Sequence, residues 1–241
     1  MIVHVFENAK QVARAAAALF AAQILKKPDS VLGLATGSTP IETYQELIQL
    51  YKDGILDFSK VVSFNLDEYV GLPATHEQSY DRFMKEQLFS HINIKETHLP
   101  SGIAPDMAQE CLDYEQKIHQ AGGIDLQLLG IGTNGHIGFN EPAEAFAYNT
   151  NITQLAESTI KANRRFFLSE DQVPKTAISM GIGTIMEARS ILLLAMGDSK
   201  AEVIQQMVNG PITPQLPASI LRSHQSVTVL LDQAAASKLG R

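Results

Sequence analysis

Residues 124–142 of this chain have the sequence IDLQLLGIGTNGHIGFNEP, an apolar run followed by a glycine-rich polar loop. The first part, Ile124–Leu129, is strongly apolar and predicts a strand buried on both faces, as in a parallel sheet. The second part, Gly130–Pro142, gathers four glycines, a histidine, two side-chain amides and a glutamate into one loop. Because ligands bind in the loops that follow the strands of α/β sheets, the stretch predicts an active-site loop.

The rest of the chain alternates short apolar runs with helical stretches. This alternation predicts a doubly wound, mostly parallel α/β sheet with helices on both faces (Rossmann-like), in a single domain over residues 1–241. The expected strands are Ile2–Phe6, Val31–Ala35, Val61–Asn65, Leu126–Ile131, Ala177–Met180, Ser190–Ala195 and Val227–Leu231. The expected helices are Ala9–Lys26, Ile41–Asp53, Ser79–His91, Ala104–Ala121, Gly183–Ala188, Lys200–Val208 and Ala218–Arg222.

Composition narrows the classes of partner. The formal net charge of −7 argues against nucleic acid or an anionic membrane as the main partner. The single cysteine, Cys111, cannot form an internal disulfide, which suits a reducing compartment. The N-terminus lacks the pattern of a secretory signal, and the longest apolar stretch, Val12–Leu25, is too short to span a bilayer. We therefore expect a cytoplasmic protein that binds a small molecule, with no nucleic acid and no membrane partner.

Polar loops follow the expected strands, and the carboxyl ends of parallel strands share one edge of a sheet. The first loop, Thr36–Pro40 (TGSTP), joins a strand to a helix. Its residues Gly37, Ser38 and Thr39 suit an anion at the helix N-terminus, because backbone N–H groups and hydroxyls donate there. Helix capping by Ser38 or Thr39 is the alternative.

Acidic and basic side chains occur in the other loops. Asp67 and Glu68 directly follow a strand, and successive side chains of an extended chain point in opposite directions, so one of the two is expected to face the crevice. That carboxylate could abstract a proton, or it could serve only in a turn. Lys200 begins a helix, and Arg164 or Arg165 could supply a second cation for a phosphate; solvated surface positions are the alternative.

His136 supplies a base that titrates near neutral pH, and Glu141 a carboxylate that could orient it. The same loop matches G-x-G-x-x-G, but HIGFNEP follows in place of the helix that a dinucleotide site requires. A metal site would need a second histidine at ligand spacing. We expect no cofactor and no metal.

Six motifs, in order, resemble the glucosamine-6-phosphate deaminase family over nearly the whole chain: ATGSTP, FNLDEYVGL, GHIGFNEP, RRFF, VPKTAISMGIGT and GDSK. The resemblance implies conversion of glucosamine 6-phosphate and water to fructose 6-phosphate and ammonia, an isomerisation and deamination in amino-sugar catabolism. It implies that Asp67 is the base for enolisation, that His136 opens the ring, oriented by Glu141 and Asn134, and that Gly37, Ser38, Thr39, Arg165 and Lys200 hold the phosphate.

Two departures from the family pattern matter. Many members have aspartate where this chain has Asn134, so we expect Asn134→Asp to preserve activity and to move its acid limb to higher pH. Allosteric members have basic residues shortly after the NEP segment and a longer C-terminal tail. Here Ala143–Thr153 contains no cation and the sequence ends at Arg241. We therefore expect no activation by N-acetylglucosamine 6-phosphate, and a monomer or small homo-oligomer.

Two other functions are compatible with parts of the pattern. A 6-phosphogluconolactonase-like hydrolase would share the fold and the G-x-G-x-x-G-H loop, but would not need a base for a carbon-bound proton at Asp67. A non-catalytic sugar-phosphate sensor would be expected to have lost acid–base residues, whereas Asp67, His136 and Glu141 are all present.

Overall fold

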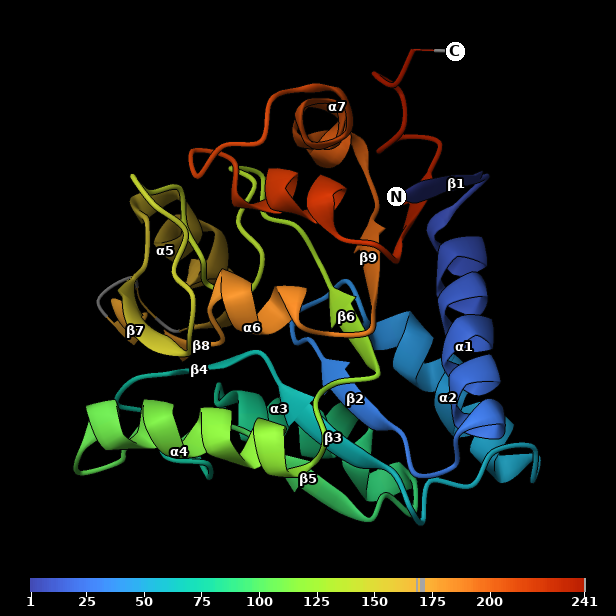
Figure 1. The fold of residues 1–241 in the computed structure, drawn as a ribbon, viewed down its shortest axis with the longest axis vertical. Coiled ribbons are helices and arrows are strands. Elements are labelled where there is room, and N and C mark those ends of the chain that lie inside the picture. Colours follow the sequence, from blue (N-terminus) through green and yellow to red (C-terminus); the bar gives the residue numbers. More distant parts are fainter. Residues whose placement is uncertain (168, 170–171, 241) are drawn as a thin grey trace.

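The chain folds around a seven-stranded sheet in which every neighbouring pair of strands is parallel (Figure 1). The computed structural model describes residues 1–167, 169 and 172–240; Leu168, Glu170, Asp171, Arg241 and the side chain of Phe166 lie outside the description. The strand order is β1 (Ile2–Phe6), β10 (Val227–Asp232), β9 (Ser190–Ala195), β6 (Leu126–Leu129), β2 (Val31–Leu34), β3 (Val62–Asn65) and β5 (Glu96–His98).

The stretch quoted first supplies β6, the central strand of this order, and all four of its residues are buried. A strand between β9 and β2 has sheet on both sides and helices above and below, which explains its nearly continuous apolar sequence. The doubly wound α/β architecture is confirmed.

Helices pack on both faces of the sheet (Figure 1). On one face lie α1 (Ala9–Lys26), α2 (Ile41–Lys52) and α3 (Tyr80–Gln87); on the other lie α4 (Met107–Gln120), α6 (Ile182–Met186) and α7 (Ala201–Asn209). In α1 the apolar spacing predicts the buried stripe, because Val12, Ala16, Phe20 and Ile24 recur at helical intervals and all are buried. The Asn8 side chain caps this helix by accepting from the backbone N–H of Gln11.

The direction of winding reverses between β2 and β6. The chain moves from β2 through β3 to β5 on one side, then returns to β6 and moves through β9 to β10 on the other. Ligand-binding crevices of open α/β sheets form at such a reversal, beyond the carboxyl ends of the two strands. The loops that begin there are Thr36–Pro40 and Gly130–Pro142.

A second, three-stranded antiparallel sheet was not expected. It has the order β4 (Asp67–Tyr69), β8 (Thr176–Ser179) and β7 (Asn151–Gln154). The expected strand Ala177–Met180 corresponds to β8, one residue earlier in the chain, but it belongs to this sheet and pairs with Asp67–Tyr69. Hydrophobic periodicity identifies a strand without specifying its partner or direction.

Other differences lie at the ends of elements. The expected helix Ser79–His91 is divided at Leu88 into α3 and the 3₁₀ turn η1 (Phe89–His91), and Ala218–Arg222 lies in the 3₁₀ helix η5 (Pro217–Ser223). Several elements had no predicted counterpart: helix α5 (Glu157–Asn163), the 3₁₀ turns η2 (Arg164–Phe166) and η4 (Asp198–Lys200), and the strands β4, β5 and β7.

None of the helices in the described part of the chain is long and apolar enough to cross a membrane.

Candidate active site

A cavity of about 460 Å³ opens at the point where the sheet reverses its winding. Its wall combines the loops after β2, β3 and β6 with residues from α5 and from η4. Eight of the nine predicted site residues line it: Gly37, Ser38, Thr39, Asp67, Asn134, His136, Arg165 and Lys200. The ninth, Glu141, lies behind His136.

One end of the cavity is cationic. The Arg165 guanidinium donates to Ser38 Oγ at 3.5 Å, and Lys200 Nζ donates to the carbonyl oxygen of Ile131 at 2.7 Å. Burial and the nearby positive charge of Arg165 both lower the pKa of Lys200. Arg165 lines the cavity and Arg164 is not among its lining residues, so Arg165 is the candidate of the two for contact with a phosphate. Two cations beside each other in a partly buried pocket favour binding of an anion.

The loop before α2 forms the other part of the candidate anion site. Residue Pro40 is the N-cap of α2 and makes no side-chain capping bond, so neither Ser38 nor Thr39 serves as the cap. Gly37 has φ of +87°, a left-handed conformation that favours glycine and turns the chain sharply ahead of the helix. Gly37, Ser38 and Thr39, directly ahead of the α2 N-terminus, line the cavity, which is compatible with the anion-binding interpretation.

Asp67 is the acidic group of the cavity wall, and its side chain is 5% exposed. No described residue donates a hydrogen bond to its carboxylate. Burial first, and the negative charge of Glu68 second, raise its pKa to about 8. A carboxylate of this kind is a strong proton acceptor when ionised, which suits removal of a proton from carbon.

Glu68 points away from the cavity, as the alternation of side chains predicts. Its carboxylate accepts hydrogen bonds from the backbone N–H groups of Tyr69, Tyr80 and Asp81. Burial raises the pKa of Glu68 to about 7, against the opposing effect of these three donors. Glu68 therefore anchors the N-terminus of α3 to β4 and fixes the strand that presents Asp67.

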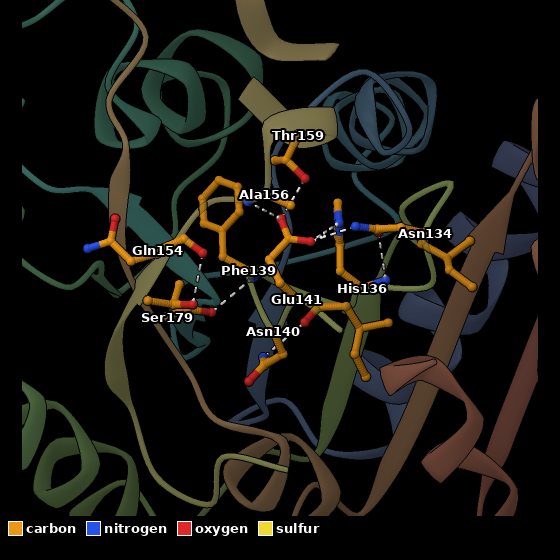
Figure 2. A network of polar contacts seen from close by, with 12 residues as sticks. Asn134, His136, Phe139, Asn140, Glu141, Gln154, Ala156, Thr159 and Ser179 are labelled. Atoms are coloured by element: carbon orange, nitrogen blue, oxygen red, sulfur yellow. Dashed lines mark hydrogen bonds and ion pairs between the residues drawn. The ribbon is translucent and has the colours of Figure 1, made fainter. Parts of the chain in front are cut away.

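Glu141 lies at the centre of a polar network (Figure 2). Its Oε2 accepts from Asn134 Nδ2 at 2.6 Å and lies 3.4 Å from His136 Nδ1, within ion-pair distance though outside hydrogen-bond geometry. Its Oε1 accepts from Thr159 Oγ1 at 2.5 Å and from the backbone N–H of Ala156 at 3.4 Å. Burial favours the neutral form, but the contacts with His136, Thr159 and Asn134 outweigh it and lower the pKa of Glu141 to about 2.

The network explains how Asn134 contacts the histidine. The amide nitrogen of Asn134 donates to Glu141, and its amide oxygen accepts from the backbone N–H of His136 at 3.2 Å, so Asn134 acts on the ring through Glu141.

The glycines of the G-x-G-x-x-G motif have a role in the local packing of this loop. A Cβ atom on Gly132 would lie 2.3 Å from His136 Cε1, so only glycine lets the ring pack there. After Gly135 the chain turns back through a bridge between Ile137 and Asn140, and no helix begins.

Sequence reasoning missed Thr159 and the capping role of Glu68. The segment Glu157–Asn163 is polar and lacks helical apolar periodicity, so nothing indicated a helix there. The available signal was that this segment lies shortly before Arg165. A segment that places Arg165 at the cavity also places the neighbouring residues of the chain near the cavity.

A parallel α/β fold in which two cations, a buried carboxylate and a histidine–glutamate pair line or back one cavity is typical of an enzyme for small phosphorylated substrates. The chain belongs to the family of glucosamine-6-phosphate isomerases and 6-phosphogluconolactonases, whose sequence profile matches residues 6–230.

Individual relatives agree with this assignment. A glucosamine-6-phosphate deaminase of Clostridioides difficile is 55% identical, covering 99% of this chain and 97% of the relative. A solved monomeric glucosamine-6-phosphate deaminase is 45% identical, with a TM-score of 0.97 over 99% of this chain and 100% of that one. A 6-phosphogluconolactonase from Trypanosoma cruzi is 21% identical, with a TM-score of 0.77 over 100% of this chain and 97% of the other, and shares the fold.

Proposed function

We propose that this chain converts glucosamine 6-phosphate and water to fructose 6-phosphate and ammonia. The observation that carries the proposal is that a buried carboxylate, a histidine–glutamate pair and an anion site line or back one cavity. Identity of more than half the residues over nearly full length to a deaminase supports the same reaction. The single thiol, Cys111, suits work in the cytoplasm, where it would stay reduced.

The first step requires ring opening, because the C2 proton becomes acidic only in the open-chain sugar. Opening moves a proton between O5 and O1, and the imidazole of His136 performs this transfer. Glu141 stays ionised and holds the ring in orientation, while Asn134 fixes the Glu141 carboxylate.

The second step moves a proton between C2 and C1, with Asp67 as the base. Delivery of the proton to C1 turns the enolamine into an iminium at C2. Water adds to that carbon and the amino group leaves as ammonia, which gives the ketose. Gly37, Ser38, Thr39, Arg165 and Lys200 hold the phosphate. Binding energy from that remote group keeps C1 and C2 against Asp67.

A lactonase is the competing function, because solved lactonases share the fold. The two are separated by supplying each substrate to the purified protein. We expect ammonia release from glucosamine 6-phosphate and little hydrolysis of 6-phosphogluconolactone. Lactone hydrolysis without ammonia release would overturn the proposal.

We also propose that the enzyme acts as a monomer or small homo-oligomer and without allosteric activation. The segment Ala143–Thr153, which follows the NEP motif, contains no cation that could bind an effector phosphate. Initial rates against glucosamine 6-phosphate should follow a hyperbola, with or without N-acetylglucosamine 6-phosphate. A sigmoidal curve that becomes hyperbolic on adding that compound would contradict this.

A further inference from the structure

Helix α5 and the turn after it contact three separate parts of the site. Thr159 Oγ1 donates to Glu141, and Asn163 Nδ2 donates to the hydroxyl of Tyr69 at 2.9 Å. Arg165 reaches Ser38 in the anion site. One short segment therefore joins the phosphate end of the cavity to the ring-opening pair and to the strand that presents Asp67.

The two oxygens of Glu141 are held from different sides. Its own loop holds Oε2 through Asn134 and His136, and the α5 segment holds Oε1 through Thr159 and Ala156. Thr159 is 5% exposed, so water cannot readily replace its hydroxyl. A carboxylate bonded at one oxygen can still rotate, whereas donors at both oxygens fix its plane. Of the two donors to Oε1, Thr159 at 2.5 Å makes a much shorter contact than the Ala156 N–H at 3.4 Å, so the direction in which Oε2 faces His136 depends mainly on Thr159.

We propose that Thr159 is a positioning residue for ring opening and that it couples phosphate binding at Arg165 to the His136–Glu141 pair. The inference rests on the roles proposed above for His136, Glu141 and Arg165. A phosphate bound between Arg165 and Lys200 holds the α5 segment against the cavity. The Thr159 hydroxyl is then kept on Glu141, and the imidazole is aligned while the substrate is bound.

The first test compares Thr159→Val with Thr159→Ser. Valine keeps the shape and removes the donor, so we expect kcat to fall about tenfold, the cost of one lost bond to a charged group. KM should change by less than about twofold, since Thr159 does not touch the phosphate. Serine restores the hydroxyl and should restore most of kcat. Thr153→Val, the same change on β7 outside the cavity, is the matched control and should leave kcat unchanged.

Two results would reject the positioning role: wild-type kcat in Thr159→Val, or a loss that Thr159→Ser fails to restore. Thr159→Ala provides the same comparison if the valine variant does not fold. Should His136→Asn retain full turnover, the proposed roles themselves would be wrong. An inactive His136→Asn beside a normal Thr159→Val would reject the inference alone.

The coupling is tested by a double-mutant cycle of Thr159→Val with Arg165→Ala, measured on kcat at saturating glucosamine 6-phosphate. We expect Arg165→Ala to lower kcat as well as to raise KM, and to lose most of its effect on kcat when Thr159 is already valine. Lys200→Ala is the matched control, because Lys200 also faces the anion site but comes from η4. Its effect on kcat should be the same in both backgrounds. Equal effects of Arg165→Ala in both backgrounds would reject the coupling.

Discussion

Asp67 and Glu141 are acidic side chains of one site that experience opposite surroundings. Asp67 is buried, accepts no hydrogen bond from a described residue, and has its pKa raised to about 8. Glu141 is also nearly buried, with a side chain 9% exposed, but donors reach both of its oxygens and its pKa is lowered to about 2. Burial alone therefore does not decide the charge of a carboxylate.

The difference matches the two chemical roles proposed for these side chains. A base that takes a proton from carbon works best with a pKa near the working pH, and poor solvation of Asp67 provides this. A carboxylate that orients a histidine must stay ionised while the proton moves, and the donors around Glu141 ensure this. Exchanging either carboxyl group for the matching amide should therefore reduce turnover for different reasons.

Asp67→Asn should have the largest effect. The amide has nearly the same shape but cannot accept the C2 proton, so we expect kcat to fall by about 10³-fold. KM should change little, because the phosphate site is separate. Ammonia release measures the loss, and turnover near the wild-type level would remove Asp67 from its proposed role.

The same variant should be more stable than the wild type. Between the ordinary pKa of 3.8 and the folded value of about 8, the unfolded chain has released the Asp67 proton and the folded chain still holds it. The wild type therefore loses stability as pH rises through this range, and the amide does not. Melting temperatures should diverge from about pH 4 to about pH 8, and equal values at pH 8 would contradict the raised pKa.

Glu141→Gln should have the second largest effect on turnover. It should lower the stability of the fold, whereas Asp67→Asn should raise it. Loss of the charge that orients His136 should lower kcat by about 10²-fold. The folded pKa of about 2 lies below the ordinary 4.5, so the ionised group stabilises the fold above pH 4.5 and this contribution is lost as pH falls towards 2. The variant should melt below the wild type at pH 7, with the gap closing in acid.

A Glu141→Gln protein as stable as the wild type at pH 7 would contradict the lowered pKa. Glu157→Gln is a suitable control for this measurement, because Glu157 is exposed at the surface of α5. Its melting temperature should follow that of the wild type throughout.

The sequence was sufficient to predict the parallel sheet and the loops that meet at its edge, because buried strands leave continuous apolar runs. The bounds of β1, α1 and β9 agree residue for residue with those expected. The small antiparallel sheet was not predictable in the same way. Leu66 alone separates β3 from β4, so the chain passes between sheets inside a motif that resembles one strand and its loop.

The internal contacts of the site were harder still to predict. Asn134 and Glu141 are seven residues apart and meet only because the loop turns back on itself. Thr159 comes from a polar helix with no apolar stripe, and its bond to Glu141 depends on how that helix packs. Residue types therefore indicated the chemistry, whereas the partners of each group required the three-dimensional structure.

Asn134→Asp should have a smaller effect on activity than the two carboxyl-to-amide changes, and it should act mainly on the pH dependence of the rate. The amide now donates to Glu141 Oε2 at 2.6 Å, and a carboxylate there would add a second negative charge beside the histidine. The protonated ring is then favoured, so we expect kcat within about tenfold of the wild type and an acid limb at higher pH. A pH–rate profile identical to that of the wild type would show that Asn134 does not influence the ring through Glu141.

Glu68→Gln should have the smallest effect on activity. It should shift the acid limb of the pH–rate profile in the direction opposite to that expected for Asn134→Asp. Glu68 is the second cause of the raised pKa of Asp67, after burial, so removing its charge lowers that pKa without removing the main cause. The acid limb of kcat/KM, which reports the free enzyme, should move to lower pH by less than about one unit. The glutamine oxygen can still accept from Tyr69 and Tyr80, which both bond Oε1, so α3 should keep most of its anchor although the bond from Asp81 to Oε2 is lost. Glu68→Ala separates the two roles, because it removes the acceptor as well and should also lower the melting temperature. An acid limb that moves to higher pH in Glu68→Gln would mean that Glu68 acts on Asp67 through the position of β4 and not through its charge.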